Sequence, residues 1–301
     1  MSLFGRWIMV DWSAASRPVR GPNSIWVADT GPANERGATA VDNPPTRHDA
    51  IELLADRLIG STASAATLIG IDASLSLPRE GITALCGSGA GWPELSAVVE
   101  SAVTDQEDNL NNRFAAAGQL NDRLGNEPGP FWGHPPTQRH RGLSPTRPTF
   151  PYGTTRIPEY RRCEQLLRAA GQGVQSTWKI AYAGSVGGQF LTVLGALSRL
   201  RDFLGERLVV WPFDSSFGTE PQSGEIWICE VWPGEFPLER APTSKPVLDA
   251  DQVFSTVRVL AHADREGSLS AWLRGPSDPA DRERAAFEGW SLSPTLAGTR
   301  A

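Results

Sequence analysis

Residues 67–71 read TLIGI and lead directly into Asp72. An unbroken apolar run of this length is typical of a central strand that is buried on both faces of a sheet. Residues 6–11 (RWIMVD) form an earlier apolar run that also ends in an acid. Two such strands, each closed by a carboxylate, predict an α/β protein with acidic side chains at the mouth of its sheet.

The segment between these two runs predicts the element order β-β-β-α-β. Residues 24–28 (SIWVA) and 37–41 (GATAV) are short apolar stretches joined by short links, as in an antiparallel meander. In 46–60 (TRHDAIELLADRLIG) the apolar side chains repeat on one helical face, with Thr46 placed to cap the start and Gly60 to end the helix. A strand, a crossover helix and a parallel strand form a right-handed unit in nearly all folds.

The rest of the chain predicts helices and two late strands. We expect one or two helices within 93–124, followed by a long ordered loop over 125–158 that is rich in Pro, Gly and Arg. A loop of that length inside a compact protein is usually functional or mobile. The remaining predicted helices are 158–170, 187–204, 250–263 and 279–288, and the predicted strands are 207–212 and 225–231.

Composition narrows the classes of function. The net charge of −6 disfavours broad, sequence-independent nucleic-acid binding, which needs a surplus of Lys and Arg. No apolar stretch approaches the roughly 20 residues of a membrane helix, and residues 1–12 contain no small-residue cleavage site, so we expect a cytoplasmic protein without a membrane partner. The three cysteines and four histidines are widely spaced, which disfavours a disulfide framework and a structural zinc site. The oligomeric state stays open.

Four acids stand at strand ends or at the start of a helix: Asp11, Asp72, Glu230 and Asp251, with Asp249 as an alternative to the last. Carboxylates within about 4–6 Å of one another raise each other's pKa unless they share a cation. Mg²⁺ and Mn²⁺ prefer oxygen ligands, so we expect these four acids to be both catalytic residues and ligands of one or two such ions. The alternative is that each acid is a turn former or a helix cap.

Basic residues concentrate between Arg139 and Arg168, among aromatic residues that can stack on bases. An arginine guanidinium binds a phosphate through two parallel hydrogen bonds. The arginines expected to contact phosphate are Arg139, Arg141, Arg156 and Arg161. The alternative is that these arginines are solvated surface charges.

A second candidate anion site is the GSVGGQ run at 184–189, which precedes a strong helix. Free backbone N–H groups at a helix start can bind a phosphate. The residues expected to hold it are Lys179, Ser185, Gly187 and Gly188. The alternative is an ordinary helix start that is capped by Ser185.

Short motifs spread over most of the chain resemble those of one family. They are residues 8–13 (IMVDWS), 71–78 (IDASLSLP), 161–164 (RRCE) and 230–233 (EVWP), with a closing Asp-bearing helix at 249–263. This pattern resembles the family called domain of unknown function 429, a predicted group of ribonuclease H-like nucleases. The resemblance implies that 1–301 is a single ribonuclease H-like domain. Its mixed sheet would be flanked by helices and interrupted after the fourth strand by a helical, Arg- and Pro-rich insertion over 79–206.

The resemblance and the acids together favour a metal-dependent phosphodiester hydrolase of the nuclease type. It would use Mg²⁺ or Mn²⁺ and act on nucleic acid or on a nucleotide-like phosphate. The alternative is a non-catalytic protein that binds a nucleotide or cofactor, with a role beside the biosynthesis of nucleotide-containing cofactors. A third interpretation is that the acids are purely structural.

Overall fold

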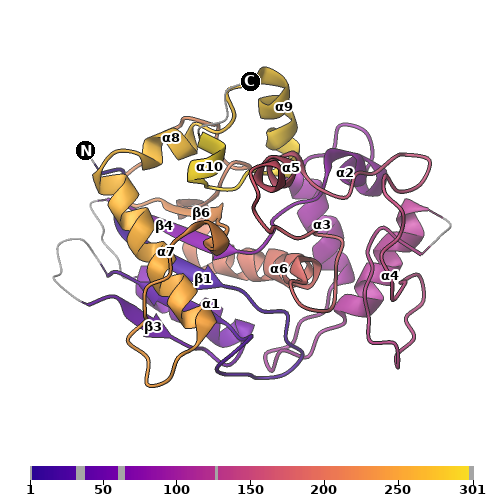
Figure 1. Cartoon of the computed structure of the whole chain (residues 1–301), viewed down its shortest axis with the longest axis horizontal. Helices are drawn as coiled ribbons and strands as arrows, with labels where there is room; N and C mark the ends of the chain where they lie inside the picture. The colour runs from indigo at the N-terminus through magenta and orange to yellow at the C-terminus, as the bar shows by residue number, and fades with distance from the viewer. Residues whose placement is uncertain (1, 32–37, 60–64, 126–127, 298–301) are drawn as a thin grey trace.

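A computed structural model describes residues 2–31, 38–59, 65–125 and 128–297 of the chain (Figure 1). Within these residues, six strands form one mixed sheet in the order β3-β2-β1-β4-β6-β5. The strands are β1 (Phe4–Asp11), β2 (Trp26–Asp29), β3 (Ala40–Asp42), β4 (Ala66–Asp72), β5 (Leu208–Val210) and β6 (Ile226–Glu230). Strands β1, β4, β6 and β5 run parallel, whereas β2 is antiparallel to both β1 and β3.

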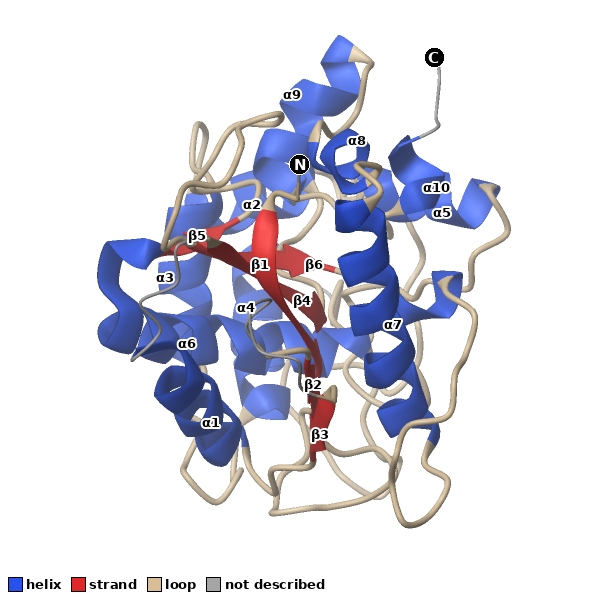
Figure 2. Ribbon diagram, turned by 90° about the vertical axis from the view of Figure 1, so that its left-hand side faces the viewer, coloured by secondary structure: helices blue, strands red, loops and turns tan. Residues whose placement is uncertain are grey.

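Helices cover both faces of this sheet. Figure 2 shows α7 on one side of the strands and α1 and α6 on the other. The helices are α1 (Arg47–Ile59), α2 (Arg79–Cys86), α3 (Trp92–Ala102), α4 (Arg113–Leu124), α5 (Arg162–Ala169), α6 (Val186–Leu204), α7 (Leu248–Arg265), α8 (Leu269–Leu273), α9 (Pro279–Glu288) and α10 (Pro294–Ala297). The expected α/β class, with a mixed sheet flanked by helices, is therefore confirmed.

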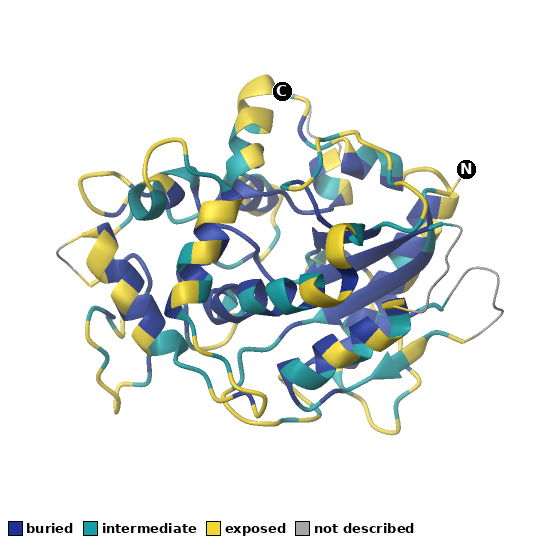
Figure 3. Ribbon diagram, turned by 180° about the vertical axis from the view of Figure 1, so that it is seen from behind, coloured by how far each residue is buried: buried dark blue, intermediate teal, exposed yellow. Residues whose placement is uncertain are grey.

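Side-chain alternation along the central strands builds two hydrophobic cores. In β1, Ile8 and Val10 belong to the core that contains α1 and α6, whereas Trp7 and Met9 belong to the core that contains α7. Strands β4 and β6 alternate in the same way, because successive side chains of a strand point to opposite faces. The central strands are accordingly buried along their length (Figure 3). The prediction of a central strand buried on both faces is confirmed.

The early elements match the predicted order, with shifted ends. Strand β3 begins at Ala40, and residue 37 of the predicted strand lies outside the described residues. Helix α1 begins at Arg47, and the hydroxyl of Thr46 accepts the Asp49 N–H at 3.0 Å, which satisfies one of the unpaired donors at the helix start. The cap expected at Thr46 is thus confirmed, whereas Gly60, the expected stop, lies outside the described residues.

In the middle of the chain, α3 and α4 are the two helices expected within 93–124, whereas α2 was not predicted. Helix α2 is short and depends on contacts from distant parts of the chain. Glu288 accepts the Arg79 N–H at 2.9 Å, and Trp178 packs so closely that a Cβ on Gly81 would lie 2.8 Å from its ring. Neither contact leaves a periodic pattern in the sequence. The loop expected over 125–158 is present, with no helix in its described residues.

Helix α5 begins at Arg162, four residues after the predicted start at 158. Glu164 accepts the Arg161 N–H at 2.9 Å, which caps the helix at this later point. In the described part of the chain, no helix is both long and apolar enough to cross a membrane.

The central strand β4 contains a glycine whose replacement tests how tightly the sheet packs. A Cβ on Gly70 would lie 2.9 Å from both Met9 Sδ and Val231 Cγ2. Gly70→Ala must displace these side chains, so we expect it to lower the free energy of unfolding by about 1–3 kcal/mol. Urea denaturation measures this change.

Gly195→Ala in α6 is the matched control, since a Cβ there would meet nothing within 4 Å. We expect it to raise the free energy of unfolding by roughly 0.5–1 kcal/mol, because alanine favours a helix interior over glycine. Equal effects of the two substitutions would contradict the packing described for β4.

Candidate functional site

A cavity of about 820 Å³ opens at the carboxyl ends of the central parallel strands. Its lining includes Asp11 and Asp72, the last residues of β1 and β4, and Asp249 from the first turn of α7. Ligands of open α/β sheets bind outside the carboxyl ends of the strands. The volume falls within the range of small-molecule sites, roughly 300–1,000 Å³.

The two strand-end acids lie side by side. Asp11 and Asp72 are partners in the parallel register of β1 and β4, so both side chains point to the same face of the sheet. Met9 and Leu68, which alternate onto that face, belong to the core that contains α7. Asp249 approaches the pair from the start of α7.

The ionised forms of these carboxyl groups are disfavoured by their surroundings. No hydrogen bond or ion pair from the described residues reaches the side chains of Asp11 or Asp72. Burial, followed by repulsion from Asp249, raises the pKa of Asp72 to about 7. Burial, then Asp72 and Asp249, raises the pKa of Asp11 well above its ordinary value. Burial also raises the pKa of Asp249, although its carboxylate accepts the Asn23 N–H at 2.6 Å.

Across the described ranges, no three or more His, Cys, Asp or Glu side chains are grouped so that they could hold a metal ion. The four-carboxylate cluster expected from the sequence is therefore not formed. Two of its members, Asp11 and Asp72, are brought together, and the third acid beside them is Asp249. The arrangement can share a proton between neighbouring carboxyl groups or share a cation.

Glu230 faces away from this pair. Its register partner on β4 is Ile71, one residue before Asp72, which places its side chain on the opposite face of the sheet. There the two terminal nitrogens of Arg161 donate to its two carboxylate oxygens at 2.7 Å each, and the Leu75 N–H donates at 2.7 Å. Glu230 lines the same cavity but is half of a buried ion pair, so it is not an unpartnered carboxylate like Asp11 and Asp72. Its role as a catalytic metal ligand stays a prediction.

Arg161 also has protein partners for its side-chain donors. Its Nε donates to Glu164 at 2.8 Å, and its Nη1 also donates to the Glu288 carbonyl at 3.0 Å. It is buried, and the acids around it raise the pKa of its guanidinium even though burial lowers it. Arg161 lines the cavity, but its side-chain donors are paired with protein acceptors. Its expected contact with phosphate stays a prediction that this pairing does not favour.

Asp251 lies outside the cavity lining. Its carboxylate accepts the Ala241 N–H at 2.9 Å and stands 4.0 Å from Arg240 Nη1. It therefore fixes the loop before α7 and lies apart from Asp11 and Asp72, and its role as a catalytic metal ligand stays a prediction that this position does not favour. Of the two late acids, Asp249 is the one that lines the cavity.

The other arginines of the predicted phosphate groove lie apart from the cavity. Arg139, Arg141 and Arg156 are exposed and do not line it. Arg141 Nε stands 3.6 Å from an Asp122 oxygen, with its side chain almost entirely in solvent. The alternative interpretation, solvated surface charge, describes these three residues, and their expected role as phosphate ligands of the site is not supported.

The start of α6 contributes to the cavity differently from what the GSVGGQ run predicts. Ser185 lines it, and its side chain makes no capping hydrogen bond. The Gly187 N–H is used, since it donates to the Lys179 carbonyl at 2.8 Å. A Cβ on Gly187 would lie 2.3 Å from the Thr177 carbonyl, and one on Gly188 would lie 3.0 Å from Ala14 Cβ. Both glycines therefore allow close packing, and neither lines the cavity, so their role in phosphate binding stays a prediction.

Lys179 is also occupied. Its ammonium group donates to the Ala183 carbonyl at 2.5 Å and reaches Gln175 at 3.4 Å, and Lys179 does not line the cavity. The structure thus gives it a role in closing the 179–183 turn. Its role as a phosphate ligand stays a prediction that these contacts do not favour.

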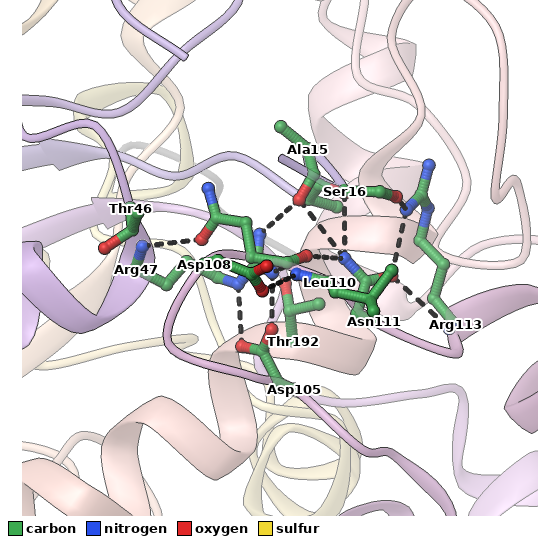
Figure 4. A network of polar contacts seen from close by, with 12 residues as sticks. Ala15, Ser16, Thr46, Arg47, Asp105, Asp108, Leu110, Asn111, Arg113 and Thr192 are labelled. Carbon is green, nitrogen blue, oxygen red and sulfur yellow. Dashed lines mark hydrogen bonds and ion pairs between the residues drawn. The ribbon is translucent and has the colours of Figure 1, made fainter. Parts of the chain in front are cut away.

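The segment that follows Asp11 is held by a buried arginine (Figure 4). Arg47 is fully buried and donates from Nη1 to the carbonyls of Ser13 and Ala15, at 2.9 Å each. Its charge is balanced by a two-bond ion pair with Asp105. Because Ser13 and Ala15 both line the cavity, Arg47 positions the wall beside Asp11.

Sequence reasoning missed Arg113, a cation that lines the same cavity. It stands outside the arginine-rich segment and belongs to no motif, so nothing in the local sequence distinguishes it. Comparison of the chain with protein-family models, with curated proteins and with solved structures found no significant match. The resemblance to the domain of unknown function 429 family therefore stays a prediction.

The raised pKa of Asp72 gives stability a specific pH dependence. Its folded-state pKa of about 7 exceeds the ordinary 3.8, so folding favours the protonated form and stability falls as pH rises between these values. Asp72→Asn removes this loss. We expect it to raise the free energy of unfolding at pH 8 by more than about 1 kcal/mol. We also expect stability to decrease less steeply as pH rises. Urea denaturation in EDTA tests this, and an unchanged pH profile would refute it.

The buried pair of Arg161 and Glu230 predicts a large stability effect. Arg161→Leu leaves Glu164 and Glu230 buried without their cation, so we expect the free energy of unfolding to fall by about 3–5 kcal/mol. Arg139→Ala is the control, because this exposed side chain should change stability by no more than about 0.5 kcal/mol. A similar small effect of both variants in chemical denaturation would show that the buried pair is not structural.

Proposed function

We propose that this chain is a metal-dependent phosphodiester hydrolase with a ribonuclease H-like core, and that Asp11 and Asp72 bind a Mg²⁺ or Mn²⁺ ion with Asp249 beside them. One observation carries the proposal. Two neighbouring carboxyl groups without protein partners line a cavity large enough for a small ligand. Repelling carboxylates without a basic partner are a functional-site signal, because a purely structural site would pair them.

The donor set fits a hydrated Mg²⁺ or Mn²⁺ ion better than a metal held by protein alone. Mg²⁺ is commonly bound by one or two carboxylates together with substrate phosphate and keeps several waters. A site with two adjacent carboxylates and no larger ligand group among the described residues agrees with that mode. When bound, the cation would supply Lewis-acid stabilisation to a phosphoryl group.

The sheet topology supports the ribonuclease H-like part of the proposal. Three antiparallel strands, β1 to β3, are followed by α1 and by β4, which returns parallel to β1. This is the β-β-β-α-β order that the sequence pattern predicts, and it agrees with a ribonuclease H-like core. The acids then come from β1, from β4 and from α7, a helix late in the chain.

The cavity size also favours a second candidate, a protein that binds a metal–nucleotide complex without hydrolysing it. The same acids would then contact a nucleotide-bound Mg²⁺. The two candidates differ in whether Mn²⁺ binds without a nucleotide and in whether a phosphodiester is cleaved.

Asp11→Asn tests the hydrolase proposal directly. We expect it to leave the circular dichroism spectrum unchanged and to abolish Mn²⁺-dependent hydrolysis of bis(p-nitrophenyl) phosphate. We also expect Mn²⁺ affinity, measured by calorimetry, to fall by about tenfold or more, because one of two adjacent carboxylate ligands is lost.

Asp251→Asn is the matched control, since this acid of the same helix as Asp249 lies outside the cavity. It should retain both Mn²⁺ binding and hydrolysis. Hydrolysis by Asp11→Asn at the wild-type rate would exclude the proposed site. Mn²⁺ binding seen only together with a nucleotide, without hydrolysis, would favour the second candidate.

A further inference from the structure

Arg113 is placed where a guanidinium ion is costly. It is the first residue of α4, and the partial positive charge of a helix start repels a cation. Burial, followed by repulsion from Arg47, lowers the pKa of Arg113 to about 10. No carboxylate of the described residues forms an ion pair with it. The surroundings of Arg113 therefore destabilise its positive charge.

The hydrogen bonds of Arg113 leave this charge uncompensated. Nη1 donates to the Ser16 hydroxyl and to the Asn111 side-chain oxygen, both of which are neutral (Figure 4). Nε is buried and has no partner, and Nη2 makes no hydrogen bond with the described residues. A buried donor without a partner costs about 1–3 kcal/mol. Because Nε is closed off from solvent, Nη2 is the nitrogen of the guanidinium that remains available to an anion in the cavity.

Two fully buried arginines near the site have carboxylate partners, unlike the half-buried Arg113. Arg47 makes a two-bond ion pair with Asp105, and Arg161 does so with Glu230. The charges of these two structural arginines are thus neutralised by carboxylates of the protein. Arg113 lines the cavity without such a partner, which points to a partner that enters from outside.

The geometry points to Arg113 as the anchor for a phosphate group of a small organic phosphate that occupies the cavity. This inference rests on the proposed function in one respect, that the anchored phosphate belongs to the ligand of the acidic site. The guanidinium lies over the Phe114 ring, 4.5 Å from its centroid, which holds its plane in place. Ser185 lines the same cavity, and because its hydroxyl makes no helix-capping hydrogen bond it offers a further donor.

The cavity also indicates the size of the ligand. A volume of about 820 Å³ accepts a molecule of nucleotide size. Phe114 and Tyr182 line it together with Arg113, so an aromatic group on the phosphate gains apolar contact. The exposed arginines Arg139, Arg141 and Arg156 lie outside it and do not extend the site into a groove for a polymer.

Calorimetric titration with inorganic phosphate and with phenyl phosphate, both in EDTA, tests the inference. We expect phenyl phosphate to bind more tightly than inorganic phosphate. We expect Arg113→Gln to weaken the affinity for phenyl phosphate by about 10- to 100-fold, which is the loss expected for a charged hydrogen bond. Arg139→Gln is the matched control and should stay within about twofold of wild type. Equal phenyl phosphate affinity of wild type and Arg113→Gln, or no binding by wild type, would overturn the inference.

A stability readout separates an anion anchor from a structural arginine. Arg113→Met should melt at or above the wild-type temperature without phosphate, because it removes a half-buried cation that has no counter-ion. It should also lose the rise in melting temperature that phenyl phosphate gives the wild type. A large fall in melting temperature without ligand would show that Arg113 is structural.

Two further measurements keep this inference distinct from the proposed hydrolase. Arg113→Gln should retain Mn²⁺ binding, and Asp11→Asn should retain phenyl phosphate binding in EDTA. Phosphate binding through Arg113 without any Mn²⁺ binding would remove the hydrolase proposal alone. Arg113-dependent binding of a 20-base-pair DNA duplex as tight as that of phenyl phosphate would overturn the small-ligand assignment.

Discussion

The parallel register of β1 and β4 is the constraint on which the site depends. It makes Asp11 and Asp72 direct partners, so that two carboxyl groups end neighbouring strands on the same face of the sheet. Their mutual repulsion and their burial oppose ionisation at neutral pH. The protein maintains this cost because both strands are buried in two hydrophobic cores that leave no freedom to shift the register.

Elsewhere the chain pairs its buried charges. Arg161 joins Glu230 to Glu164, and Arg47 ties Asp105 to the segment after β1. Against this background the unpaired groups stand out, and they line one cavity: acids on one part of its wall and Arg113 on another. Local conflict of this kind, within an otherwise consistent structure, is the usual signature of a site kept for a ligand at the expense of stability.

Much of the fold could be predicted from the sequence. The apolar runs that end in Asp11 and Asp72 mark real strands, and Thr46 caps a real helix, because burial and capping are local chemistry. Helix α2 was missed because distant contacts, from Trp178 and Glu288, hold it. Of the predicted site residues, Asp11, Asp72, Arg161, Ser185 and Glu230 line the cavity. Arg161 and Glu230 are paired with each other there, and the other predicted arginines lie outside the cavity.

The sequence by itself determined the class of fold, the order of its central elements and the presence of carboxylates at strand ends, because periodicity and apolar runs are read residue by residue. Only the tertiary structure decided which carboxylates meet. Glu230 ends its strand as Asp72 does, yet a register that pairs it with Ile71 turns it to the opposite face and onto Arg161. Strand register and the approach of distant helices arise from packing between segments, which no local pattern of residues encodes.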